Sequence, residues 1–169
     1  MTVRTPEVLK GYFDSKDKPT AENFADLIDS FIDPIITAIP SGDHIASGPK
    51  ITLIATSVVA FGDICYIDSA GGATLVNASV IATSCALVMA LGTINAGASG
   101  SFLIMGIARD DTWSWTVGGL IFITITGTTG NTLSQTPPTG TDEVIQVVGV
   151  ATNATRIFFN PQLVQVEHI

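Results

Sequence analysis

Charge is what this sequence has least of. Only 13% of its 169 residues are Asp, Glu, Lys or Arg, while 46% are hydrophobic. An average soluble domain has about 25% charged residues. Proteins that bind nucleic acid need clustered Lys and Arg side chains, and this chain has seven such residues against fifteen acidic ones, so we expect no nucleic acid partner. The low charge instead suggests a chain that buries surface against other subunits.

The few cations are unevenly placed. Five of the seven lie within the first 50 residues, and the rest of the chain has only Arg109 and Arg156. Seven acidic residues follow residue 50, so that part carries 7 − 2 = 5 excess negative charges. This split separates a short N-terminal segment from a larger, charge-poor remainder.

Long apolar runs and cysteines are also scarce. The N-terminus has no apolar signal-peptide core, and the most apolar run, residues 80–91, is too short to span a bilayer. We therefore expect no membrane partner and synthesis in the cytoplasm. The two cysteines, Cys65 and Cys85, show no CxxC spacing, which favours buried free thiols over a disulfide or a metal site.

One amphipathic helix is predicted near the N-terminus, after a weaker helical turn over residues 5–13. Thr20 is a good N-cap, and Glu22 places a carboxylate at the positive end of the helix. The apolar positions that follow recur at helical spacing and form one stripe: Phe24, Leu27, Ile28, Phe31, Ile32 and Ile35. A lone helix of this length is marginal in water. We therefore expect the stripe to dock, on its own β domain, on sister subunits or on a foreign surface.

The pattern changes to short β-rich runs after a linker rich in Pro, Gly and Ser. We place the boundary there, with a helical arm and linker over residues 1–47 and a β-rich domain over residues 48–169. The predicted strands cover residues 51–55, 63–67, 73–76, 86–93, 101–107, 113–116, 119–126, 144–151, 154–159 and 163–167. Strands at this spacing with no helical pattern between them predict a mainly β fold, a compact antiparallel β-sandwich or barrel-like domain.

The stretch from residue 100 to 126 is the centre of that domain. In a strand over 101–107, Leu103 and Met105 would share one face with Ile107, and Phe102 would share the other with Ile104. Both faces are apolar. One copy looks too small to cover them, so we expect copies of the chain to associate.

Candidate sites for chemistry are weak. His44 lies in the linker and His168 is next to the last residue, so neither belongs to a nucleophile, base and orienter set. Asp110 and Asp111 supply too few oxygen ligands for Ca²⁺ and are typical of a turn. We expect the acidic pair at residues 142–143 to be charged residues at the edge of a strand. We therefore expect no catalytic residues, no cofactor and no metal, and a protein that is not an enzyme.

Trp113 and Trp115 are the exception, and they keep two interpretations. On a strand they would share one face, where aromatic rings can stack on a sugar. Alternatively, large aromatics cap a β core or line the seam of a trimer.

Several strings resemble those of bacteriophage virion proteins. Residues 9–31, LKGYFDSKDKPTAENFADLIDSF, are similar to the N-terminal module of tail-fibre and other virion appendage proteins. The β part resembles small phage fibre and capsid-decoration domains in five strings: GDICYID at 62–68, AGASG at 96–100, DDTWSWTVGG at 110–119, VIQVVGVA at 144–151 and IFFNP at 157–161.

This resemblance implies a homotrimeric, non-enzymatic protein of the virion. Its arm would anchor to the major capsid protein or another virion protein, and its β domain would form the trimer. Because the chain has no long shaft repeat and no separate tip domain, we expect a capsid decoration, or cement, protein. The alternative is a short tail-fibre or baseplate component that binds a receptor or glycan.

Overall fold

The structure, a computed structural model, describes residues 20–24 and 39–168 and divides the chain into two units, residues 1–38 and 39–169. In the first unit, residues 21–24 form a helical turn that begins at the predicted N-cap. The Thr20 hydroxyl accepts the Asn23 N–H at 3.2 Å, and the Asn23 side-chain oxygen accepts the Thr20 N–H at 2.8 Å, which is a reciprocal cap. Phe24 is 49% exposed. The rest of the predicted docking stripe, Leu27, Ile28, Phe31, Ile32 and Ile35, lies outside the described residues, as does the turn predicted at 5–13.

The second unit is mainly β, which confirms the predicted fold class. Its strands are β1 (Ile45–Ser47), β2 (Lys50–Ile54), β3 (Ile64–Ile67), β4 (Ala73–Leu75), β5 (Val88–Ala90), β6 (Ser99–Leu103), β7 (Gly106–Arg109), β8 (Leu120–Thr128), β9 (Asn131–Ser134), β10 (Val144–Ile145), β11 (Val147–Asn153), β12 (Arg156–Phe159) and β13 (Val166–Glu167). One short 3-10 helix, Ile81–Thr83, lies between β4 and β5. No helix among the described residues is long and apolar enough to cross a membrane.

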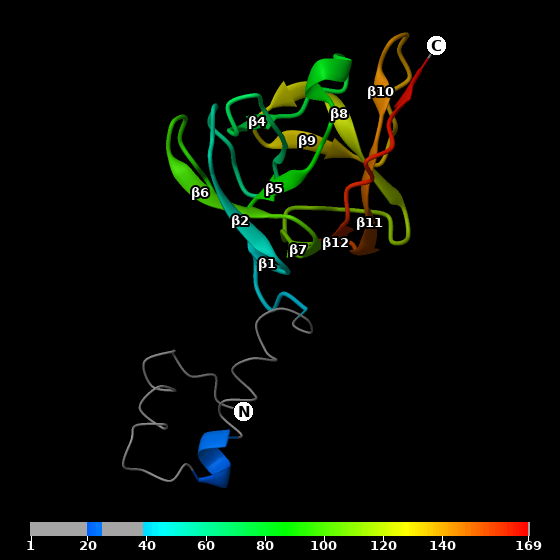
Figure 1. The fold of residues 1–169 in the computed structure, drawn as a ribbon. Helices are drawn as coiled ribbons and strands as arrows, with labels where there is room; N and C mark the ends of the chain where they lie inside the picture. Colours follow the sequence, from blue (N-terminus) through cyan, green and yellow to red (C-terminus); the bar gives the residue numbers. More distant parts are fainter. Residues whose placement is uncertain (1–19, 25–38, 169) are drawn as a thin grey trace. The chain divides into compact units, whose positions relative to one another are not determined.

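The strands form two main antiparallel sheets (Figure 1). The six-stranded sheet has the order β1-β7-β12-β11-β8-β9, and the five-stranded sheet has the order β2-β6-β5-β3-β4. A two-stranded ladder joins β10 to β13 near the C-terminus. Because β1 pairs with β7, residues 45–47 belong to the β unit, and the division between the units falls before the predicted linker.

The five-stranded sheet curls back on itself. The end of β2 meets the start of β4 through a bridge between Ala55 and Ala73, where the Thr56 N–H donates to the Ala73 carbonyl at 2.9 Å. The concave side holds its own buried cluster, made of Ala55, Val59, Cys65, Ala73, Val88, Ala90, Ile94 and Phe102. The sheet therefore approaches a small barrel with a filled interior.

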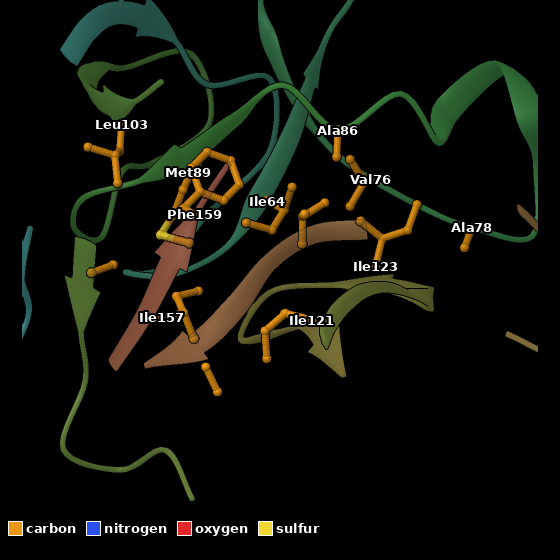
Figure 2. Packing of buried hydrophobic residues seen from close by; sticks show 13 residues of the cluster. Ile64, Val76, Ala78, Ala86, Met89, Leu103, Ile121, Ile123, Ile157 and Phe159 are labelled. Atoms are coloured by element: carbon orange, nitrogen blue, oxygen red, sulfur yellow. The ribbon is translucent and has the colours of Figure 1, made fainter. Parts of the chain in front are cut away.

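A second cluster lies between the two sheets (Figure 2). The five-stranded sheet contributes Ile64, Met89 and Leu103, and the six-stranded sheet contributes residues that include Ile157 and Phe159. Successive residues of one strand point to opposite faces, so the five-stranded sheet needs apolar residues on both faces. This corrects the expectation that one copy cannot cover the central stretch only for Phe102 and Leu103, which are both fully buried within a single chain, because other apolar residues of that stretch, such as Leu120 at 50%, stay exposed.

Two strand predictions in the central stretch are wrong. Residues 101–107 are not one strand, because the chain leaves the five-stranded sheet after β6 and enters the six-stranded sheet as β7. At the crossing, Ile104 and Met105 are each 42% exposed, rather than lying on strand faces. Residues 113–116 form no strand; they belong to the irregular segment between β7 and β8. β1 and β9 were not predicted.

Candidate functional site

The outer face of the six-stranded sheet carries an apolar row. Ala108 and Ile157 face the core, so alternation places their neighbours Ile107 and Phe158 on the outer face. Strand register then aligns one apolar residue from each of four adjacent strands: Ile107, Phe158, Val150 and Leu120. We call these four residues the outer apolar row.

The outer apolar row is open to solvent in the chain alone. Leu120 is 50% exposed, and the other three side chains are partly exposed. Val147 and Phe122 form a second apolar pair on the neighbouring rung. Apolar side chains aligned across four strands, with no charge among them, are suited to contact with another apolar surface.

Trp113 and Trp115 lie on the core rather than on a strand. Both are partly buried against the cluster between the sheets. Their ring centroids are 5.7 Å apart, and Trp113 continues the contact to Phe61 at 6.3 Å. The pair therefore caps the β core, which was one of its two predicted roles.

A small hollow nevertheless opens beside the tryptophans. It has a volume of about 110 Å³ and is lined by residues that include Trp113, Trp115, Phe61 and Thr132. The indole N–H of Trp115 is buried and has no hydrogen-bond partner in the structure. An orphaned donor of this kind is suited to a small acceptor group. The hollow is well below the 300 to 1,000 Å³ or so of pockets that enclose a drug-sized ligand.

His44 and Asp110 come together across the ends of β1 and β7. Ile45 pairs with Arg109 in the antiparallel register, so the residues just outside this pair face one another. The His44 Nε2 atom lies 3.3 Å from Asp110 Oδ2. The His44 ring also contacts that of Phe61 in a tilted arrangement, with ring centroids 4.9 Å apart, and its neighbour Asp43 lies in the same cluster. His44 was predicted to lie in a linker, and its contact with Asp110 was not predicted.

Asp110 and Asp111 do form the predicted turn, although they play different parts in it. Asp110 is 6% exposed, and its Oδ1 accepts the Thr112 N–H at 2.8 Å and the Thr112 hydroxyl at 2.6 Å. Asp111 is exposed and binds the Arg109 guanidinium through both carboxylate oxygens, at 2.6 and 3.0 Å. The hydrogen bond from Arg109 lowers the pKa of Asp111.

Asp63 is a buried carboxylate with a structural role. Its oxygens accept N–H groups from Ala60 and Gly130 at 2.8 Å, and the Thr132 hydroxyl at 3.3 Å. Burial outweighs these hydrogen bonds and raises its pKa. Burial, with the charge of Asp63, also raises the pKa of the Cys65 thiol to about 12. Both cysteines are free, Cys65 buried and Cys85 partly buried.

The remaining predicted positions lie near the C-terminus. Asp142 is exposed, and its N–H donates to the His168 carbonyl at 2.7 Å. The Glu143 carboxylate accepts the Gly140 N–H at 2.6 Å. These contacts fix the turn before β10 and join it to the backbone at His168.

No protein-family model matches the chain, and no curated protein or solved structure is similar to it.

Proposed function

We propose that the chain is a non-enzymatic structural protein of a phage virion, a capsid decoration protein. It associates as a homotrimer through its β domain. Its N-terminal arm docks on the major capsid protein or another virion protein. The observation that carries the proposal is the outer apolar row, together with the strings that resemble virion proteins.

The outer apolar row supports association of copies. Leu120, at 50% exposure, stands next to Val150 on a sheet face that carries no charge along the row. Covering such a face releases water from apolar surface, which contributes about 25 cal/mol for each Å² buried. The row itself carries no charge, so rows from three copies can meet around a three-fold axis without bringing like charges together.

The first test is the mass of the full chain in solution. We expect light scattering after size-exclusion chromatography to give a trimer, and Leu120→Lys to convert it to a monomer, because the ammonium group would be buried at the contact. Ile81→Lys is the matched control. Ile81 is similarly exposed at 56% but belongs to the 3-10 helix rather than to the outer apolar row, so this variant should stay trimeric. A wild-type monomer would contradict the proposal.

The second test concerns the arm. Deleting residues 1–38 should leave the trimer intact but abolish co-sedimentation with capsids of the phage that carries the gene. The docking stripe on which this expectation depends, Phe24 to Ile35, is an inference from helical spacing. If the truncated protein still sediments with capsids, the β domain rather than the arm binds the capsid.

A second candidate function is a short tail-fibre or baseplate component that binds a receptor or glycan. Trp115, which lines the hollow and whose buried indole N–H has no hydrogen-bond partner, favours it. A glycan array probed with the full chain and with Trp115→Phe tests this directly. Phenylalanine keeps an aromatic ring and removes the donor, so selective loss of glycan binding by a folded variant would favour this function over capsid decoration.

A further inference from the structure

Three potential metal ligands meet at the start of the β unit. Asp43 and His44 precede β1, and Asp110 follows β7, its partner strand. One ligand atom from each of the three side chains lies within 4.8 Å of the others. Two of these residues are adjacent in sequence and the third is 66 positions away from His44, so the site exists only when β1 and β7 pair.

Each carboxylate is held by hydrogen bonds at one oxygen and faces His44 with the other. Asp43 Oδ1 accepts the His44 N–H at 3.0 Å and the Asp111 N–H at 2.8 Å. Asp110 Oδ1 accepts both donors of Thr112. The two remaining oxygens face the imidazole, at 3.8 Å from Nδ1 for Asp43 and 3.3 Å from Nε2 for Asp110. Fixing the first oxygen by hydrogen bonds orients the second, as the outer contacts of metal ligands do.

The charge of the cluster is unbalanced. Asp43 and Asp110 bring two carboxylates to one imidazole, and the adjacent cation, Arg109, is hydrogen-bonded to Asp111, although its charge also acts on Asp43. Asp110 is 6% exposed, and a buried carboxylate is costly unless a cation neutralises it. A divalent ion would balance both carboxylates at once.

From this geometry we propose that Asp43, His44 and Asp110 form a binding site for a divalent transition-metal ion such as Zn²⁺. One nitrogen and two oxygen ligands suit Zn²⁺, which takes three protein ligands and a water at about 2.0 to 2.2 Å. In a tetrahedral site, ligands at that distance lie about 3.4 Å apart, which the 3.3 Å between His44 and Asp110 already matches. The Asp43 oxygen, 3.8 Å from the other imidazole nitrogen, would have to move closer to join them. Ca²⁺ is disfavoured because it takes about six to eight oxygens. The bound ion would tie the start of β1 to the turn at residues 110–112.

The test uses the full-length chain without a histidine tag, stripped of metal with a chelator, and titrated with Zn²⁺ by calorimetry. We expect one ion per chain and a rise in the thermal unfolding midpoint, because an ion that binds only the folded state stabilises it. Co²⁺ should bind at the same position and quench tryptophan fluorescence, because Trp113 lies near the site, with its ring 6.3 Å from Phe61, whose ring is 4.9 Å from that of His44. Ca²⁺ should not displace the bound Zn²⁺ or Co²⁺.

His44→Gln is the decisive variant, because the side chain of His44 is 54% exposed and its loss should leave the fold intact. It should weaken Zn²⁺ binding by about tenfold or more and remove the thermal shift, and the milder Asp43→Asn should also weaken binding. The matched control is His168→Gln, which alters the chain's other histidine and should bind Zn²⁺ like wild type. Absence of Zn²⁺ binding, or equal binding by folded His44→Gln, would overturn the proposal and leave an ion pair between His44 and Asp110.

Discussion

Phe102 and Leu103 are neighbours in β6, yet they fill different cores. Phe102 lies in the cluster inside the curled five-stranded sheet, and Leu103 lies in the cluster between the two sheets. Both side chains are fully buried. The five-stranded sheet is therefore the shared wall of two cores, and this explains why its sequence is apolar on both faces.

Truncating either residue should destabilise the protein strongly. We expect Phe102→Ala to lower the free energy of unfolding by about 3 to 5 kcal/mol and Leu103→Ala by about 2 to 5 kcal/mol, because each leaves a cavity in a packed core. Urea unfolding followed by circular dichroism measures both. The control is Ile104→Ala. Ile104 is the next residue but is 42% exposed, so the change should stay within about 0.5 kcal/mol. An equal loss in all three variants would contradict the two-core arrangement.

The fold class was predictable because turn residues and short β-rich runs alternate along the chain. The division of residues 101–107 was not, because period-two alternation cannot mark a strand break when both faces are apolar. Residues 113–116 were mistaken for a strand because Trp113 and Trp115 alternate with polar neighbours, although loop hydrogen bonds place them: the Trp115 N–H donates to the Ala154 carbonyl at 2.8 Å. β9 was missed because Asn131–Ser134 is mostly polar.

The candidate sites were harder to predict from the sequence than the strands, because they form only in the tertiary structure. The helix cap at Thr20 is a local signal and was found. The outer apolar row joins one residue from each of four strands, and only the register between the strands reveals it. The meeting of His44 with Asp110 follows from the pairing of β1 with β7, and no local pattern marks β1 because it is short and follows a Pro- and Gly-rich linker.

The chain crossing between β6 and β7 should tolerate no side chain at Gly106. Gly106 has φ 149°, and a Cβ there would collide with the Ser47 carbonyl oxygen on the neighbouring strand. Gly106→Ala should therefore cost clearly more than the roughly 1 to 2 kcal/mol of forcing an L-residue into a left-handed conformation. Chemical denaturation of the purified variant measures the loss.

Gly130→Ala separates the two causes of destabilisation, the steric clash of an added Cβ and the conformational cost of a positive φ. Gly130 has φ 76° in the turn between β8 and β9, and an added Cβ would have no atom within 4 Å. This variant should lose only the conformational contribution. If Gly106→Ala and Gly130→Ala are equally destabilised, close backbone approach does not constrain the crossing.

The Cys65 thiol should be inert in the folded protein. It is fully buried, and its pKa is raised to about 12, so almost no thiolate forms at neutral pH. In a Cys85→Ser variant, we expect an aromatic disulfide reagent to label no thiol until denaturant is added. In the matched Cys65→Ser variant, the partly buried Cys85 should react faster under native conditions. Rapid native labelling of Cys65 would show that the curled sheet opens readily.

The contributions of Asp63 and Asp68 to the stability of the folded protein should change in opposite directions with pH. Burial raises the pKa of Asp63 above its ordinary value of 3.8, so just above pH 3.8 the folded protein holds a proton that the unfolded chain has lost. The contribution of Asp63 to stability therefore falls as the pH rises through that window. Backbone N–H groups of Gly72 and Ala70 lower the pKa of the exposed Asp68, so its contribution is present at neutral pH and is lost as the pH falls below 3.8.

Unfolding of wild type, Asp63→Asn and Asp68→Asn at a series of acidic pH values measures both effects. On acidification, wild type should gain stability relative to Asp63→Asn and lose stability relative to Asp68→Asn. Using the two asparagine variants as references cancels the titration of the other carboxylates, which they share with wild type. A difference of the same sign for both variants would mean that the hydrogen bonds from Ala60, Gly130 and Thr132 outweigh the burial of Asp63, and that its carboxylate is charged in the folded protein throughout this range.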